Sequence, residues 1–205
     1  MRIDFDPAEM DRNSFYKLLT AVVVPRPIAW VSTVSESGTH NLAPPSFFTV
    51  WCVRPPMVQF TSVRRKDSLN NVEATGEFVV NLAPEQLFEQ INATGTDFPP
   101  EVDEFDAVGI AREPSLKVKP PRVAASPVAL ECRLHSTITL GDSTLVIGQV
   151  VHAAVSETVL VDGHPEVRRL RPLARLGKDE WSTLGEVLEI PRLRYADWKR
   201  REGGH

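Results

Sequence analysis

The chain has 205 residues, of which 42% are hydrophobic and 24% charged, and its formal net charge is -4. This composition can bury one core of ordinary size, so a single domain over residues 1–205 is predicted. The acidic balance argues against nucleic acid or an anionic membrane as a partner, and an anionic ligand would need a local basic patch.

Several classes of protein are excluded by patterns that the sequence lacks. Residues 1–11 contain no apolar leader, and the longest apolar stretch, residues 18–24, is too short to span a bilayer, which favours a cytoplasmic location. Cys52 and Cys132 lack neighbours at a metal-ligand spacing, so core thiols are predicted, with a disulfide as the weaker alternative, and no metal site is expected. Because no Gly-x-Gly triplet or Gly-Lys-Ser/Thr sequence occurs, a Rossmann site and a P-loop are excluded.

The prolines, 17 in number and often paired, divide the chain into short elements, because proline ends helices and interrupts central strands. The segments with strand composition are, in chain order, residues 28–34, 57–62, 77–82, 128–140 and 145–155. Turn sequences follow the first of these at residues 35–38 and separate the last two at residues 141–144. A mainly β, antiparallel architecture is therefore predicted.

Helical patterns are few. Residues 67–75 begin with Asp67, a residue typical of helix N-caps, and are followed by Gly76, while residues 84–93 begin with a proline. Two short helices on a β framework indicate a barrel with helices at its rim. The charged residues 192–205 are predicted to form a loose C-terminal tail.

A basic turn stands between the strand at residues 57–62 and the helix that begins at Asp67. It carries Arg64, Arg65 and Lys66, and three cations beside free helix N-terminal amides form a suitable seat for a phosphate dianion. A solvated charge cluster on a turn is the alternative interpretation.

Residues 41–48, with the sequence NLAPPSFF, cannot form a regular central strand because of their two prolines. Such a backbone can direct amides and hydroxyls at a flat heteroaromatic ring while aromatic side chains cover it, and Trp30 and Ser32 on a neighbouring strand favour this pocket. The alternative is an apolar loop that packs under the barrel.

Six segments resemble, in the same order, those of the flavin-reductase-like, FMN-binding split-barrel family, which includes flavoredoxin and the reductases of two-component monooxygenases. They are PRPIAWVSTVSESG at residues 25–38, NLAPPSFFTV at 41–50, RPPMVQFTS at 54–62, RRKDSLNN at 64–71, TGEFVVNL at 75–82 and RPLARLG at 171–177. The resemblance implies an antiparallel split β-barrel with a few short peripheral helices. It also implies a homodimer with the flavin near the subunit interface.

The resemblance implies a set of FMN-binding residues. The isoalloxazine ring and ribityl chain would lie along Trp30, Ser32, Asn41, Ala43, Ser46, Phe47 and Phe48. The phosphate would lie at Ser62, Arg64, Lys66, Asp67 and Ser68, with Asn81 and Gly177 nearby. The chain departs from the family pattern at Ser143, where the monooxygenase partners commonly have histidine, and at Lys178, which replaces the second glycine of a pair.

The leading functional interpretation is an NAD(P)H-dependent flavin reductase that passes hydride or electrons through bound FMN to an acceptor the sequence does not identify. No catalytic side chain is assigned, because the two cofactors carry the chemistry themselves. The alternatives are a flavoredoxin-type electron carrier reduced by a protein partner and a flavin-binding module without turnover.

Two further features each have two interpretations. The acidic segment at residues 92–106 could be a lid over the pocket or a solvated surface loop, and the surface loop is slightly favoured. His152, on a strand with alternating polarity, could face the flavin or be an ordinary strand histidine, and the second reading is favoured.

Overall fold

The computed structural model describes residues 1–202. Its helices are α1 (Arg12–Val22), α2 (Asp67–Thr75), α3 (Phe88–Ala93), α4 (Glu104–Val108), α5 (Val167–Leu170) and α6 (Tyr195–Glu202), with 3-10 turns η1 (Glu85–Leu87) and η2 (Glu157–Val159). The main sheet contains β2 (Ala29–Val34), β3 (His40–Ala43), β4 (Phe48–Cys52), β5 (Met57–Val63), β6 (Glu77–Leu82), β9 (Val128–Leu140) and β10 (Ser143–Val155). The shorter strands are β1 (Arg26–Pro27), β7 (Arg112–Glu113), β8 (Arg122–Val123), β11 (Leu160–Val161), β12 (His164–Pro165), β13 (Ala174–Arg175) and β14 (Trp181–Ser182).

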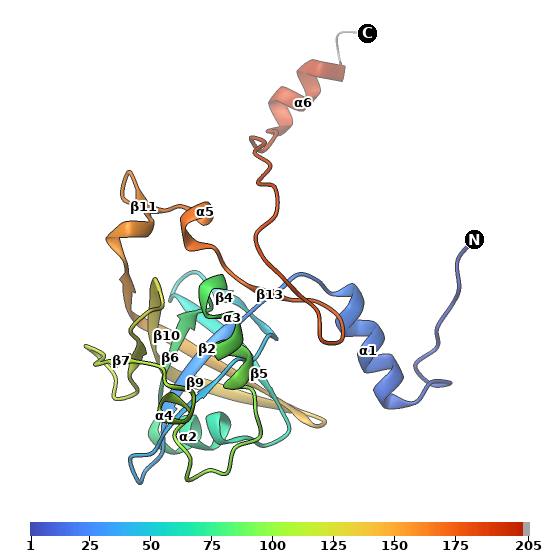
Figure 1. Ribbon diagram of the computed structural model, residues 1–205. Helices are drawn as coiled ribbons and strands as arrows, with labels where there is room; N and C mark the ends of the chain where they lie inside the picture. The colour runs from blue at the N-terminus through green and yellow to red at the C-terminus, as the bar shows by residue number, and fades with distance from the viewer. Residues whose placement is uncertain (203–205) are drawn as a thin grey trace.

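The main sheet has the strand order β3-β2-β6-β9-β10-β5-β4, and every neighbouring pair is antiparallel. The prediction of a mainly β, antiparallel architecture is confirmed (Figure 1). The two longest strands, β9 and β10, form a hairpin in which Leu140 faces Ser143 and Gly141 adopts a φ of 60°. This left-handed conformation suits glycine, so the predicted turn at residues 141–144 is present.

The segment between β3 and β4 closes the curved sheet. The carbonyl of Pro45 accepts a hydrogen bond of 2.9 Å from the amide of Ala29 on β2, and the carbonyl of Phe47 accepts one of 2.9 Å from the amide of Thr61 on β5. Because β2 and β5 lie near opposite ends of the strand order, residues 44–47 bridge the two ends of the sheet. The proline pair therefore stands at the seam of the barrel, where a regular strand is absent.

Strand β2 is buried on both of its faces. Ala29 and Val31 belong to an apolar cluster with Phe78 and Val146, whereas Trp30, with its neighbour Ile28, belongs to a second cluster that includes residues of α3 and α4. The alternation of side chains along the strand places these two sets on opposite faces. The first cluster fills the barrel, and the second joins the barrel to the helices that cover it.

The helices at the rim are more numerous than the two that the sequence predicted. Helix α2 has the predicted bounds and ends at Gly76 with a φ of 73°, although its N-cap is Lys66, and Asp67 is its first residue. Helix α1 was not predicted; the Asp11 carboxylate caps it by accepting hydrogen bonds of 3.0 and 3.1 Å from the amides of Asn13 and Ser14. In the sequence, Asp11 as an N-cap residue was the local signal that could have predicted the start of α1.

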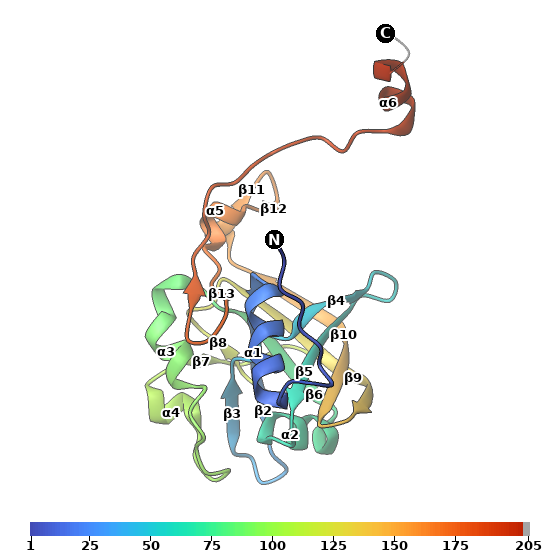
Figure 2. The ribbon, with the colours of Figure 1, turned by 90° about the vertical axis from the view of Figure 1, so that its right-hand side faces the viewer.

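The chain beyond β14 leaves the body of the molecule, and α6 lies apart from the barrel in both views (Figures 1 and 2). The predicted loose tail therefore contains a helix at Tyr195–Glu202, and its residues 203–205 lie outside the described part of the chain. Within residues 1–202, no helix is long and apolar enough to cross a membrane.

The two cysteines lie in different environments, and neither forms a disulfide. Cys132 is fully buried in the barrel, and burial raises the pKa of its thiol far above the usual range. Cys52 is partly exposed at the end of β4. The prediction of core thiols is therefore right for Cys132 and wrong for Cys52, because β4 is an edge strand.

Candidate functional site

A cavity of about 580 Å³ lies beside the segment that closes the barrel. Its walls come from residues 43–47, from the end of β5 and the start of α2, and from the loop at residues 94–98. The lining is completed by Tyr16 of α1, Asn41 of β3, Asn92 of α3, Glu104 of α4, Arg175 of β13 and Trp181 of β14. The volume is within the range of roughly 300–1,000 Å³ that small-molecule sites occupy.

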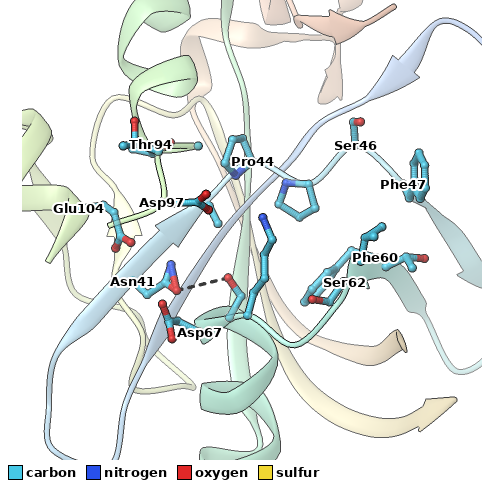
Figure 3. A pocket seen from close by; sticks show the side chains of 18 of the residues that line it. Asn41, Pro44, Ser46, Phe47, Phe60, Ser62, Asp67, Thr94, Asp97 and Glu104 are labelled. Carbon is cyan, nitrogen blue, oxygen red and sulfur yellow. Dashed lines mark hydrogen bonds between the residues drawn. The ribbon is translucent and has the colours of Figure 1, made fainter. Parts of the chain in front are cut away.

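The structure brings together many of the residues that the sequence assigned to the flavin. Those that line the cavity are Asn41, Ala43, Ser46, Phe47, Ser62, Lys66, Asp67 and Ser68. Figure 3 shows several of them facing a common space between β3, the barrel seam and the start of α2. Their contact with FMN stays a prediction, and the structure places them where one ligand could reach them all.

Three other predicted flavin contacts are buried in the fold. The Trp30 indole nitrogen donates a hydrogen bond of 2.9 Å to the Thr94 hydroxyl, and the Ser32 hydroxyl donates to the carbonyl of Pro121. The Asn81 amide nitrogen donates to the Trp30 carbonyl at 3.0 Å, and its oxygen accepts from the Val123 amide at 2.9 Å. All three side chains have no exposed surface and are outside the cavity lining, so they support the site from behind.

The remaining three predicted contacts also lie outside the cavity. Phe48 packs on the barrel core. A side chain at Gly177 would stand 3.1 Å from the Cα atom of Ala21, so this glycine permits the close packing of α1. Arg64 is exposed, adopts a φ of 62° and donates its amide to the Asp142 carbonyl at 2.7 Å; its neighbour Arg65 lines the cavity instead.

The start of α2 supplies the cationic end of the cavity. The first hydrogen bond of the helix runs from the Asn70 amide to the Lys66 carbonyl, and no side chain caps this end, so the preceding amides lack helical partners. Arg65 forms an exposed ion pair with Glu73, whereas Lys66 has no ion pair among the described side chains of residues 1–200. Cations and open helix amides at one place can bind an anion.

The opposite side of the cavity is acidic (Figure 3). Glu104 is buried there and accepts a hydrogen bond of 3.0 Å from the Leu42 amide, while the Ser68 hydroxyl donates to the Asn41 side chain at 3.4 Å. Burial raises the pKa of Glu104, against the lowering effect of its backbone hydrogen bonds. Asp97 also lines this side. Glu104 and Asp97 would repel a phosphate, so the Lys66 end is left for it, where the cations and open helix amides stand beside the Asp67 carboxylate.

The acidic segment at residues 92–106 takes part in the cavity, and the preference for a plain surface loop was wrong. Asp97, Phe98 and Glu104 line the cavity, while Asp103 lies outside the lining and forms a partly buried ion pair of 2.9 Å with Arg112. The spacing of acidic residues could not separate these two groups. The turn of α4 separates them, because it directs Glu104 inward.

Some cavity residues were missed although the sequence carried a signal for them. Arg175 belongs to the quoted segment RPLARLG, from which only Gly177 was assigned to the site. Tyr16 was missed together with α1, and Trp181 follows the same segment without a pattern of its own. His152 is absent from the lining and faces Glu131 across the β9–β10 ladder, as an ordinary strand histidine does.

Comparisons with known proteins place this chain in a family. Residues 21–171 match the model of the flavin reductase like domain. The structure is similar to nitrilotriacetate monooxygenase component B from Bacillus cereus, with 32% identity, a TM-score of 0.90, and 93% of this chain and 99% of that chain covered. It is also similar to the 2-nitrobenzoate 2-nitroreductase NbaA of Pseudomonas fluorescens, with 28% identity, a TM-score of 0.88, and 94% and 98% coverage.

The fold is that of a third protein, from Shewanella frigidimarina, whose name gives it a split barrel domain; identity is 19%, the TM-score is 0.84, and 94% of this chain and 100% of that chain are covered. The predicted split barrel is therefore confirmed, and so is the resemblance drawn from the six sequence segments. The family match covers most of the chain, including β2, the barrel seam and the start of α2. This chain belongs to the flavin reductase-like family.

Proposed function

We propose that this protein binds FMN in the cavity at the barrel seam and acts as an NAD(P)H-dependent oxidoreductase. The observation that carries the proposal is the polarity of the cavity, with Lys66 and open helix amides at one end and Phe47 with Ser46 along the seam. The names of two similar proteins, a monooxygenase component and a nitroreductase, support redox chemistry.

The residues of the cavity fit the chemical parts of FMN. Lys66 and the hydroxyl of Ser62 can bind a phosphate, since charged donors and helix amides recognise phosphate oxygens. Pro44 and Phe47 offer flat apolar surface to a ring, and the Asn41 amide lies where a polar ring edge or ribityl hydroxyl would need a partner. When bound, the flavin would supply the hydride and electron chemistry.

The work of the chain is then binding, orientation and exclusion of water. The barrel seam and the loop with Asp97 and Phe98 enclose the cavity from two sides. A second ring would lie beside the flavin near Ser46, Tyr16 and Trp181, which line the same cavity. Because the sequence has no separate dinucleotide motif, nicotinamide and electron acceptor would use this same space in turn.

The test is anaerobic mixing of the FMN-loaded protein with NADH or NADPH. We expect the flavin absorbance to bleach in one phase whose rate saturates with nicotinamide concentration, because a stacked complex must form before transfer. Reduction by dithionite is the control for an accessible flavin. If dithionite bleaches the flavin and neither nicotinamide does, the protein is an electron carrier of the flavoredoxin kind or a module without turnover.

We further propose that the protein is a homodimer. Two apolar stretches are exposed in the single chain: Leu19 and Val22 on α1, and Val50, Trp51 and Val53 at the β4–β5 turn. Contiguous exposed apolar patches are typical of interfaces. Helix α1 also places Tyr16 in the cavity, so a second copy against α1 would adjoin the site.

Sedimentation should report a dimer, and Val22→Glu together with Trp51→Glu should shift it toward the monomer, because two carboxylates cannot be buried without partners. The control is Ile190→Glu, in the tail, at a residue that is 89% exposed. A monomeric wild type at micromolar concentration would contradict the dimer.

We also propose the cytoplasm as the location of the protein. Its two cysteines are free thiols, which fits a reducing compartment.

A further inference from the structure

Three side chains line up across the small sheet β1-β13-β14. Arg26 faces Arg175, and Arg175 faces Trp181, in the antiparallel registers of the two pairs. Residues directly opposite each other on antiparallel strands share one face of a sheet. Arg175 and Trp181 of this row line the cavity. The row therefore presents a guanidinium and an indole to the ligand space.

Arg175 is held in place and still has donors to offer. Its guanidinium carbon lies 4.6 Å from the centre of the Trp181 ring, and the Phe88 ring fixes this indole in an edge contact at 5.2 Å. One guanidinium nitrogen donates to the Lys178 carbonyl at 2.9 Å. An arginine has five N–H donors. Among the side chains of residues 1–200, Arg175 has no carboxylate partner at ion-pair distance, and its guanidinium forms no other hydrogen bond there.

Arg26 is the opposite case, because its donors are used within the fold. It donates to the carbonyls of Thr20, Val23 and Leu176, and its Nε lies 3.4 Å from the Ser46 hydroxyl. It is 8% exposed and, in the described residues, has no carboxylate at ion-pair distance. Its charge is therefore fixed behind Ser46 without neutralisation by a carboxylate.

Two like charges face each other at this point. Directly opposed cations destabilise an antiparallel pair. Burial lowers the pKa of Arg26 most strongly, Tyr16 raises it, and the charge of Arg175 adds a smaller lowering effect. An unfavourable pair that persists beside a cavity is typical of a functional site, because a ligand of opposite charge removes the repulsion.

The surroundings of this pair are aromatic. Tyr16 and Phe47 lie with ring centres 6.4 Å apart, and the Arg26 guanidinium is 6.0 Å from the centre of the Phe47 ring. Together with Trp181, both rings line the cavity. Aromatic side chains favour a flat ligand, and a guanidinium with unused N–H donors favours carboxylate or phosphate oxygens.

We infer that Arg175 and Trp181, with the charge of Arg26 behind Ser46, form a subsite for the anionic group of a planar aromatic substrate. The anion is a carboxylate or phosphate oxygen group, and the ring that carries it packs against Tyr16 and Phe47. This inference rests on the proposed function, since the subsite would hold the molecule that exchanges electrons with the flavin. It is separate from the proposed phosphate seat at Lys66.

Calorimetric titration with benzoate and benzamide tests the subsite, in FMN-loaded and in flavin-free protein. We expect benzoate to bind at least tenfold more tightly than benzamide. A tenfold difference in affinity corresponds to about 1.4 kcal/mol of binding free energy. Arg175→Gln should remove the difference, and Arg175→Lys should keep part of it. Arg133→Gln, on exposed β9 surface, is the matched control and should leave the preference unchanged.

A second pair of probes identifies the source of the anion. Nicotinamide mononucleotide and nicotinamide riboside differ by a phosphate, so a preference for the mononucleotide that Arg175→Gln removes assigns the subsite to a nucleotide. A preference seen only with benzoate assigns it to a carboxylate substrate. Equal binding of the charged and neutral members of both pairs, or a preference that survives in Arg175→Gln, overturns the inference. Failure of FMN to bind would instead refute the proposed function, and the flavin-free titrations would still decide the subsite.

Discussion

Replacing Arg65 and Lys66 together with glutamine should weaken FMN binding by roughly 3 to 6 kcal/mol, because each hydrogen bond from a charged donor to an anion contributes about 1.5 to 3 kcal/mol. Riboflavin, which lacks the phosphate, should bind the variant and the wild type equally. Fluorescence quenching of each flavin on titration with protein measures both constants. Lys66 should carry the larger share, because Arg65 is already ion-paired with Glu73.

Arg64→Gln is the matched control for this pair, since it removes the same charge from the adjacent residue. Arg64 is exposed and outside the cavity lining, so its substitution should leave FMN binding nearly unchanged. If Arg64→Gln, Arg65→Gln and Lys66→Gln, each made alone, weaken FMN binding equally, the three cations attract the phosphate by a general field and do not form a specific binding site. If the wild type binds riboflavin and FMN equally, the basic turn is a solvated charge cluster.

The strands of the barrel could be predicted from the sequence because their signals are local. Residues 57–62, 77–82 and 128–140 have β-branched and aromatic composition and are bounded by turn residues, and the structure has β5, β6 and β9 there with nearly the same bounds. The same is true of α2, whose end at Gly76 needs only the left-handed conformation of that residue. Turn chemistry and propensity decide these boundaries without tertiary contacts.

The direction of individual side chains could not be predicted in this way. Alternation along β2 separates Trp30 from Val31, but it does not say which face meets a ligand, and here both faces are covered. At the basic turn, the φ of 62° at Arg64 decides which of the consecutive cations reaches the cavity. The amino-acid composition of the turn does not predict that backbone angle.

The cavity also depends on contacts between distant segments. Tyr16, Asp97 and Arg175 meet around it although they are far apart in the chain. The position of Tyr16 follows from the capping of α1, that of Asp97 from the turn before α4, and that of Arg175 from the pairing of β13 with β1. No sequence window contains these relations, so the resemblance supplied residues on its six segments and left out Tyr16 and Asp97, which lie outside them, and Arg175, which lies within the last one.

Replacing the buried carboxylate of Glu131 with the amide in Glu131→Gln should lower the free energy of unfolding by about 3 to 5 kcal/mol, the usual cost of removing one partner of a buried ion pair. Glu131 has no exposed surface. Its oxygens accept hydrogen bonds from the amides of Leu116 at 2.9 Å and Lys117 at 2.6 Å, and from Nε of Arg122 at 2.9 Å. Glutamine offers one acceptor oxygen and brings an NH₂ group toward these donors.

The pH dependence of stability should change with the same substitution. Burial alone would raise the pKa of Glu131, but hydrogen bonds from Leu116, Arg122 and Lys117 outweigh it and hold the pKa below its ordinary value of 4.5. A carboxyl group whose pKa is lower in the folded state binds its proton first in the unfolded state. Its contribution is therefore complete above the unfolded pKa and is lost as the pH falls through the folded one.

Chemical denaturation of wild type and Glu131→Gln at pH 7 and at steps below 4.5 would show this behaviour. The two stability curves should lie furthest apart at neutral pH and approach each other in acid, because only the wild type loses the ionised Glu131. Glu113→Gln is the control: Glu113 also pairs with Arg122, at 3.0 Å, but its side chain is 47% exposed, so its loss should cost less than about 1 kcal/mol. A constant gap between the curves at every pH would mean that Glu131 stabilises the fold by shape and hydrogen bonding alone. Equal effects of the two substitutions would mean that the buried bonds to Leu116 and Lys117 contribute little, and that the loop they fix against the barrel is held by other contacts.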